Sequence, residues 1–474
     1  MLLALAAAAR LWTLGVKNIW LDEVASWVEA SYPIPRLLES VAGDIHPPLY
    51  YLMLKGWIVL AGDGPVALRF PSVVFGVLVV FASWFLSRRW LKPSPRIAAG
   101  VWIAVSPHLV FYSQEARMYA PATAAVLAAC LAYRRWIESR FTSTSSLLAF
   151  TLAAIVALYL HYFTALAGLA LTIHLLIAAR GHRRAVIRWL VAHAVIVAAY
   201  APWMPAAAEQ ITRGQPWRQP VGLPELPRYL AVLTGEFMTG YHLEWSLLLT
   251  AALAVVAYVL MRGWVGLVAL IRRDRDERDL WLALLCAVPV IVSLLALPLT
   301  GHMGLSRYLA YLTPLLVIAA ARGLDAWPLS SGHRHATLVT AAALASAVCL
   351  VSYYRDPLRD FDVRPAIRAL AAEVEAAGGD PGVAVVDPAF MEMCIRYYAR
   401  EPLVRYQPMP PGESIWKMLD DVGRGHPGRL WLVVARDSVR FDAAGVPDRF
   451  RLEEVTLQPS HPDRIRLLRV IRTP

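Results

Sequence analysis

The stretch that decides the fold is ALRFPSVVFGVLVVFASWFLSRRWLKPSPR, residues 67–96. Its first part, residues 67–87, is apolar apart from Arg69 and three serines and has the length of roughly 20 residues that a helix needs to cross a bilayer. Arg88 and Arg89 follow at once, and further basic residues come a few positions later. An apolar run that ends in a basic cluster is typical of a membrane helix with its basic end in the cytoplasm.

The composition of the whole chain extends this prediction. The 474 residues are 58% hydrophobic, with a mean hydropathy of +0.49, whereas soluble domains are typically about 45–50% apolar. The net charge of +11 does not indicate a nucleic-acid partner, because the basic residues form short clusters between apolar runs. The four cysteines show neither a disulfide framework nor metal-binding spacing.

Eleven apolar runs are predicted to span the membrane. The first begins at Met1 without a basic segment before it or an A-x-A site after it, so we expect a membrane helix there and not a cleaved signal peptide. The predicted spans are roughly 2–18, 67–87, 97–111, 119–136, 145–160, 163–179, 186–205, 245–262, 280–298, 305–321 and 335–353.

Alternate loops between these runs are rich in arginine and lysine, which predicts the orientation by the positive-inside rule. The basic loops, predicted to be cytoplasmic, contain Arg88, Arg89, Lys92, Arg96, Arg134, Arg135, Arg140, Arg180, Arg183, Arg184, Arg188, Arg262, Arg272, Arg273, Arg275, Arg278, Arg322 and Arg334. The intervening loops, although longer, contain only Arg36, Lys55, Arg117, Arg213, Arg218, Arg228 and Arg307.

One further run, residues 47–62, would invert every later loop if it spanned. We therefore interpret it as a helix that lies on the outer membrane face or re-enters it. Pro47 and Pro48 suit its first turn, and Lys55 interrupts its apolar surface. The N-terminus is then inside, and the region after the last span is outside.

From Arg355 onward charged residues become frequent and long apolar runs stop. Residues 362–379 have the pattern of a capped amphipathic helix, and the segments VAVVD, RLWLVVA, FRLEEVTL and RIRLLRVIR have the pattern of strands. We therefore predict a membrane domain over 1–354, with a first outer loop at 19–66, and a small extracytoplasmic α/β domain over 355–474.

Ionisable residues collect on the outer side of this topology. Any one of them, such as His161, is readily explained as a solvated loop residue or an interfacial side chain. Together they indicate a functional site, because ionisable groups at membrane depth are costly. The set comprises Asp22, Glu23 and His46, the turn YSQEARMY at 112–119, His161, His242 with Glu244, and His302, Arg307 and Tyr308.

The motifs WLDEVASW, HPPLYYLMLKGW, ALRFPS, YSQEARMYA, LHYF and SRYLAYLTPLL, in this order, resemble bacterial glycosyltransferases of the GT-C fold, in the protein O-mannosyltransferase-like branch. The resemblance covers roughly residues 11–324 and is strongest over the first 165. It implies a multi-pass enzyme of the cell (inner) membrane that transfers a sugar from a polyprenyl-phosphate donor to an acceptor hydroxyl on the outer face. The acceptor could be a glycan, a lipid or a protein. The absence of a Gly-rich phosphate loop agrees with a lipid donor instead of a nucleotide.

The resemblance also suggests roles for individual residues. Asp22 matches the catalytic aspartate and would act as the general base, Glu23 would orient Asp22 or the acceptor, and Glu115 matches a second acidic site near the sugar or a metal. A cation should stabilise the departing lipid phosphate, for which Arg307 with Tyr308 is the first choice and Arg117 and Lys55 are the second. The expected substrate-binding residues are His46, Tyr119, His161 and His242. Since no second nucleophile is evident, we expect inversion at the anomeric carbon.

Several alternatives stay open at this point. Asp22, Glu115 and His46, with His161, could supply ligands for a divalent metal ion, but their spacing is not that of a metal motif. The enzyme could instead be a ligase that moves a whole glycan from its lipid carrier. Readings other than an enzyme are a transporter, which should show repeated halves and a midplane site, or a cell-wall-binding protein with a membrane anchor.

Overall fold

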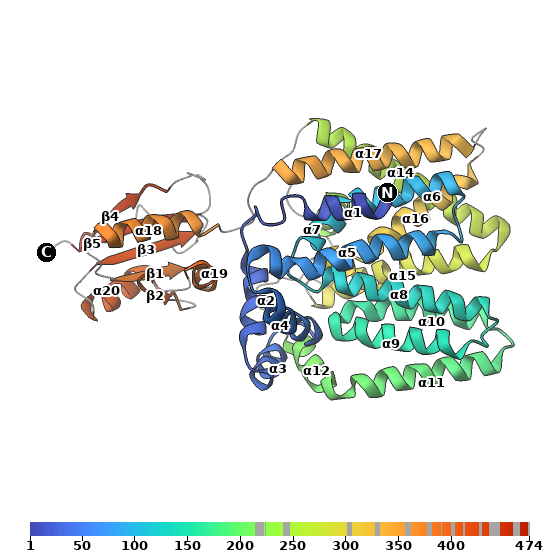
Figure 1. Cartoon of the computed structure of the whole chain (residues 1–474), viewed down its shortest axis with the longest axis horizontal. Helices are drawn as coiled ribbons and strands as arrows, with labels where there is room; N and C mark the ends of the chain where they lie inside the picture. The colour runs from blue at the N-terminus through green and yellow to red at the C-terminus, as the bar shows by residue number, and fades with distance from the viewer. Residues whose placement is uncertain are drawn as a thin grey trace. The chain divides into compact units, whose positions relative to one another are not determined.

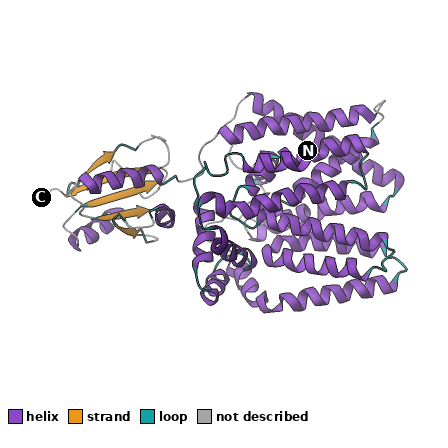
Figure 2. Ribbon diagram, viewed as in Figure 1, coloured by secondary structure: helices purple, strands orange, loops and turns teal. Residues whose placement is uncertain are grey.

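The computed structural model of the chain forms two compact units, one helical and one built on a small sheet (Figures 1 and 2). The helical unit comprises Met1–Leu14 and Glu29–Asp356, and the sheet unit comprises Gly15–Val28 and Pro357–Pro474. The structure describes residues 1–213, 222, 224–239, 247–300, 306–327, 332–355, 362–376, 382–389, 391–399, 403–410, 413–425, 429–435, 446–457 and 465–472.

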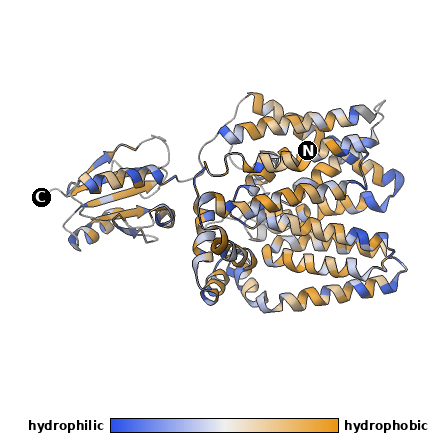
Figure 3. Cartoon of the chain, viewed as in Figure 1, coloured by the Kyte–Doolittle hydropathy of each residue, from blue (hydrophilic) through white to orange (hydrophobic). Residues whose placement is uncertain are grey.

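Most of the helices run side by side through the helical unit, and their apolar residues extend along the helix lengths (Figure 3). The first part of the chain forms α1 (Leu2–Leu11), α2 (Leu21–Ser31), α3 (Ile34–Gly43), α4 (Leu49–Ala61), α5 (Pro65–Ser87), α6 (Pro93–Val105), α7 (Pro107–Ser113), α8 (Tyr119–Glu138) and α9 (Thr144–Leu160). Next come η1 (Tyr162–Thr164), α10 (Ala165–Ala178), α11 (Arg183–Tyr200), η2 (Ala201–Trp203), α12 (Met204–Arg213) and α13 (Leu226–Thr239). The unit ends with α14 (Leu247–Asp274), α15 (Glu277–Thr300), η3 (Ser306–Leu309), α16 (Leu312–Gly323), η4 (Leu324–Ala326) and α17 (Gly332–Arg355).

Helices occur at every predicted apolar run, which confirms a mainly helical protein with a small C-terminal sheet. Within the described residues, five segments are long and apolar enough to cross a bilayer: 65–87, 183–213, 247–274, 277–296 and 334–355. Shorter apolar helices occupy 2–11, 49–61, 144–160 and 162–178. The number of eleven spans stays a prediction.

Some boundaries differ from the expected ones for local reasons. The predicted span 97–111 breaks at Ser106, whose ψ of 119° is extended, because Pro107 disfavours a helical conformation in the residue before it. Helix α4 covers the ambiguous run and is about 20 Å long at 1.5 Å per residue, too short for a core of about 30 Å. Helix α13 was not expected, since its sequence mixes polar and apolar residues.

Glycines allow two close approaches between helices. A Cβ at Gly76 of α5 would overlap Ser113 Oγ and would lie 2.7 Å from Arg10 Nε, so the position accepts only hydrogen. Gly263 and Gly266 of α14 face Gly323 of α16, where an added Cβ on any of the three would run into the backbone of the opposite helix. Such contacts between small residues are a common way for membrane helices to pack.

In the sheet unit the strands are ordered β2-β1-β3-β5-β4. They are β1 (Val383–Asp387), β2 (Arg405–Pro408), β3 (Leu430–Ala435), β4 (Phe450–Val455) and β5 (Ile465–Arg472), with β1 parallel to β2 and β3, and β5 antiparallel to β3 and β4. The helices of this unit are α18 (Arg364–Ala376), α19 (Met391–Tyr398) and α20 (Ile415–Gly425). The four strands and α18 expected from the sequence are confirmed, whereas β2 was not predicted.

Candidate functional site

The turn that contains Glu115 and Arg117 is buried inside the helical unit. Every residue from Tyr112 to Tyr119 is at most 5% exposed, including both charged side chains. The sequence predicted an outer turn, which suggested contact with solvent. Burial of a charged turn is costly unless its polar groups have partners, so the contacts of this turn define the candidate site.

Hydrogen bonds from three other helices hold the turn. Gln114 Nε2 donates to the carbonyls of Arg10 at 2.9 Å and Trp12 at 2.6 Å, and Gln114 Oε1 accepts from the hydroxyl of Tyr353 at 2.8 Å. Arg10 Nε donates to Ser113 Oγ at 3.1 Å. Ser72 Oγ of α5 donates to the carbonyl of Arg117 at 3.3 Å. Since α1, α5 and α17 all contribute contacts, the turn has a fixed conformation.

A cluster of aromatic rings and histidines surrounds Tyr308 of η3. The ring of His161 lies 4.8 Å from that of Tyr308, between their centroids, and that of His46 lies 6.0 Å from it. The ring of Tyr119 is 6.4 Å from Tyr308 and 6.0 Å from His161. The structure therefore brings together four of the predicted site residues, from segments that are far apart in the sequence.

Two arginines belong to the same cluster. The guanidinium of Arg307 lies 5.5 Å from the centre of the Tyr308 ring. The charges of Arg117 and Arg307 both act on His161, and those of Glu115 and Arg307 act on Tyr112. Arg117, Arg307 and Glu115 thus share a mostly buried region at one end of the helices.

His161 is neutral in this environment. Its side chain is 3% exposed, and burial, together with the charges of Arg117 and Arg307, lowers its pKa to about 3. Its Nδ1 accepts from the backbone N–H of Phe163 at 3.3 Å, so the proton of the neutral ring is on Nε2. Within the described residues Nε2 is buried and has no hydrogen-bond partner. His161 therefore offers one N–H donor inside the cluster.

Glu236 of α13 is a member of this region that the sequence did not indicate. It accepts a hydrogen bond from Ser306 at 2.8 Å, and Ser306 directly precedes Arg307. Nothing in the local sequence around Glu236 pointed to this contact. Only the folding of α13 against η3 brings the two segments together.

The Lys55 ammonium makes its hydrogen bonds at the end of α2. It donates to the carbonyls of Tyr32 at 2.8 Å and Ala30 at 3.3 Å, at the C-terminal end of α2. A cation at this position stabilises the end of a helix. His242, Glu244 and His302 lie outside the described residues.

Asp22 and Glu23 are in the first turn of α2 and belong to the sheet unit. Glu23 is fully buried, whereas Asp22 is partly exposed. The segment before them contacts α19, since the Tyr398 hydroxyl and the backbone N–H of Ile19 are 2.5 Å apart. The ring of Trp27 meets that of Tyr397 edge-on, with centroids 5.3 Å apart. Arg364 NH1 also reaches the carbonyl of Val16, at 3.4 Å.

No group of three or more histidine, cysteine, aspartate or glutamate side chains converges on a metal-binding position in the described part of the chain. None of Asp22, Glu115 and His46 belongs to such a group within those residues.

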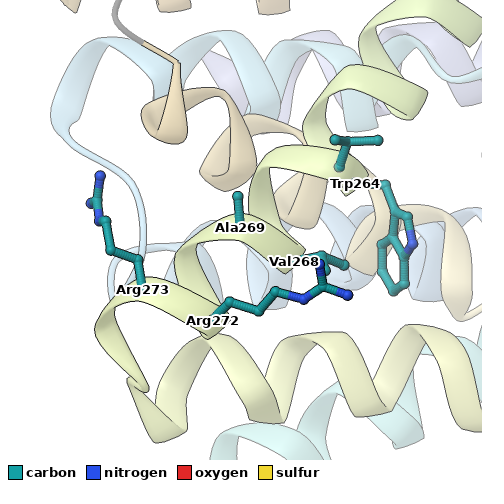
Figure 4. Close-up of a pocket in the computed structure, with 6 residues that line it drawn as sticks. Trp264, Val268, Ala269, Arg272 and Arg273 are labelled. Carbon is teal, nitrogen blue, oxygen red and sulfur yellow. The ribbon is translucent and has the colours of Figure 1, made fainter.

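A cavity of about 560 Å³ lies elsewhere, along α14 (Figure 4). Its lining comes from this one helix. Trp264, Val268 and Arg272 follow each other at intervals of four residues on one face, and Arg272 extends along the helix past Val268 in the direction of Trp264. The lining contains no acid or histidine, so it lacks the groups that sugar transfer would need.

Comparison with known proteins agrees with the resemblance noted in the sequence. Residues 45–205 match the family described as dolichyl-phosphate-mannose-protein mannosyltransferase. This range includes His46, Glu115, Arg117 and His161 and leaves out Asp22 and Arg307. No curated protein sequence matches the chain.

Solved structures show the same fold over nearly the whole chain. ArnT from Cupriavidus metallidurans in the apo state superposes with a TM-score of 0.59 and 14% identity, over 99% of this chain and 97% of ArnT. The same protein bound to undecaprenyl phosphate gives a TM-score of 0.56. The oligosaccharyltransferase AglB from Archaeoglobus fulgidus, in complex with an inhibitory peptide and a dolichol-phosphate, gives 0.56 at 12% identity, over 92% of this chain and 68% of AglB.

Proposed function

We propose that this chain, a multi-pass protein with the GT-C glycosyltransferase fold, transfers a single sugar from a polyprenyl-phosphate donor to an acceptor hydroxyl. The observation that carries the proposal is the mostly buried cluster of Arg117, Arg307 and neutral His161. It offers two cations and the His161 Nε2–H, which has no hydrogen-bond partner among the described residues. Such a set suits a phosphate, whose oxygens accept hydrogen bonds and carry negative charge.

The leaving group explains why these residues are needed. When the bond between the anomeric carbon and the phosphate oxygen breaks, negative charge develops on the lipid phosphate. Arg307 and Arg117 stabilise that charge in a region from which water is largely excluded, where each interaction is stronger than in solution. His161 donates its Nε2–H to a phosphate oxygen and needs no change in protonation to do so.

The acceptor hydroxyl must lose a proton as it attacks. Asp22 is the base, as the family resemblance implies, and Glu23 orients the acceptor or Asp22. Glu115 contacts the sugar. A single displacement of this kind inverts the anomeric carbon.

The similarity to ArnT supports a lipid donor, since ArnT has been solved with undecaprenyl phosphate and aligns with nearly the full length of this chain. The family matched by residues 45–205 is described by a dolichyl-phosphate-linked sugar. The distribution of arginines supports placing the site and the C-terminal domain on the outer face of the cell membrane.

Donor binding is the first test. The purified chain should bind undecaprenyl phosphate, as followed by native mass spectrometry, and should turn over a polyprenyl-phosphate sugar in the presence of an envelope extract. Mass spectrometry of envelope glycans and glycoproteins from cells with and without the gene then identifies the product. Loss of one sugar residue from a glycan, lipid or protein is the expected result.

The second candidate is transfer of a complete oligosaccharide, which the similarity to AglB favours. The same comparison of envelopes separates the two functions. Disappearance of an entire glycan from a protein, with its lipid-linked form accumulating, would contradict single-sugar transfer.

A further inference from the structure

A second polar cavity, of about 420 Å³, opens between the ends of α5, α8 and α10 and the turn that joins α14 to α15. Four arginines line it: Arg89, Arg134, Arg275 and Arg278. Helix α8 begins at Tyr119 in the cluster described above and reaches Arg134 about four turns later, which is roughly 20 Å along its axis. The cavity is therefore at the opposite end of the helices from that cluster.

The acids at this cavity do not balance its arginines. Glu138 of α8 accepts from Arg89 at 2.5 Å and lies 3.8 Å from Arg134 Nε. Asp276 accepts from the backbone N–H of Arg278 at 2.9 Å, in the first turn of α15. Asp276 and Glu277 line the cavity with the four arginines, so positive charge remains even after Glu138 is included.

Two buried N–H groups at the cavity make no hydrogen bond among the described residues: Trp281 Nε1, and Arg134 Nε, which has only the Glu138 carboxylate at 3.8 Å. Arg134 already uses NH1 on the carbonyl of Phe85 at 2.8 Å. Trp281 is 3% exposed, and its ring packs against that of Trp90 at 5.1 Å, which fixes its orientation. A buried donor without a partner is unusual, so Trp281 Nε1 points to an acceptor that the described residues do not supply.

His174, which also lines the cavity, cannot provide that acceptor. Its Nδ1 lies 2.8 Å from the Tyr133 hydroxyl, and its Nε2 lies 3.0 Å from the carbonyl of Glu277. A carbonyl only accepts, so Nε2 carries the proton and Nδ1 accepts from Tyr133. Both nitrogens are occupied. What the cavity offers a ligand is positive charge and N–H donors.

We propose that this cavity binds the phosphate of an anionic phospholipid. It lies at the ends of apolar helices, the level at which the head groups of a bilayer are found, and its lining includes the apolar side chains of Ile137 and Trp281. Arg275 and Arg278 are exposed at its mouth and meet the head group, while Arg134 and Trp281 donate to the phosphate from the inside. Basic pockets between membrane helices bind acidic head groups in this way. The site is separate from sugar transfer and does not depend on the proposed function.

Native mass spectrometry of the purified full chain tests the proposal with three probes: phosphatidylglycerol, phosphatidylcholine and inorganic phosphate. Wild-type protein should retain phosphatidylglycerol at least several-fold more than phosphatidylcholine. Arg278→Gln should lower phosphatidylglycerol occupancy about tenfold, since a charge-assisted contact is lost, and Trp281→Phe about threefold, since the ring stays and only its N–H is removed.

Arg184→Gln is the matched control, because it removes an exposed arginine at the start of α11 that does not line the cavity. Its occupancy should equal that of the wild type. Equal losses in Arg184→Gln and Arg278→Gln, with Trp281→Phe unchanged, would overturn the site in favour of general surface charge. Occupancy by inorganic phosphate as high as that by phosphatidylglycerol would overturn the assignment to a lipid.

Discussion

The motifs YSQEARMY and WLDEVASW both place charged residues next to apolar helices, but different parts of the molecule hold them. The first is buried in the helical unit, where Gln114 and Ser113 are hydrogen-bonded to other membrane helices. The second belongs to the sheet unit, where Ile19 and Trp27 contact two tyrosines of α19. Helix packing thus determines the position of the residues proposed to bind phosphate, whereas contacts with the C-terminal region determine the position of the proposed base.

Replacing Asp22 should have the largest effect on turnover. Asp22→Asn is nearly isosteric but cannot take a proton, so turnover should fall by roughly 10²–10⁴-fold while binding of undecaprenyl phosphate stays at the wild-type level. Glu23→Gln should give a smaller loss, seen mainly in acceptor affinity. The assay is transfer from a purified polyprenyl-phosphate sugar. Near-normal turnover by a folded Asp22→Asn variant would move the base to Glu115 or His46.

Replacing Arg307 tests the residues of the helical unit that are proposed to bind phosphate. Arg307→Ala should weaken donor binding by about 1.5–3 kcal/mol, which is roughly 10–150-fold, because a charge-assisted contact to the phosphate is lost. Arg307→Lys should recover part of this, since the charge returns without the planar fork. Arg36→Ala, on the exposed surface of α3, is the control. Unchanged donor affinity in Arg307→Ala would remove this residue from the site.

Replacing Gly76 tests whether helix packing determines the conformation of the buried turn. Gly76→Ala should destabilise the protein by about 1–3 kcal/mol, because its methyl group would push against Ser113 and Arg10. Gly168→Ala on α10 is the control, since nothing lies within 4 Å of its added Cβ. Thermal unfolding in detergent measures both. Equal melting temperatures for the two variants would show that the turn tolerates a shift of α5.

Tyr398 tests the contact that holds the acidic segment, with the smallest expected effect. Tyr398→Phe removes the hydroxyl beside Ile19, and one such hydrogen bond contributes about 0.5–1.5 kcal/mol. Amide exchange over residues 15–22 should become several-fold faster, while exchange over 112–119 stays the same. Tyr406→Phe is the matched control, because the Tyr406 hydroxyl has no partner within the described residues. The same exchange rates in both variants would show that the Tyr398 hydroxyl of α19 does not stabilise the acidic segment.

The sequence predicted those features that depend on local pattern. Long apolar runs gave the positions of α5, α8 and α14, and short continuous apolar runs gave β1 and β3. It could not predict that the charged turn at Glu115 is buried, because hydropathy assigns a charged turn to solvent. Nor could it predict the contact of Glu236 with Ser306, since 70 positions separate them and only the folded chain brings them together.

The segment that contains Asp22 shows that neighbours in the sequence do not reveal which distant residues pack together. The sequence placed Asp22 and Glu23 in a loop of a domain covering 1–354, because apolar runs surround them on both sides. In the structure, residues 15–28 pack with residues that come more than 300 positions later. Tyr397 and Tyr398 give no local signal of this role, since paired tyrosines in an amphipathic helix are ordinary core residues.

The contact of Gly263 and Gly266 with Gly323 limits how the helices can move. Helix α16 starts four residues after Tyr308, whose ring lies against the Arg307 guanidinium, so displacing η3 would also displace α16. Sliding α16 by one turn along α14 would bring Val259 or Leu267 to the place of Gly263, where only hydrogen fits. The close packing at these glycines therefore opposes sliding of α16 along α14.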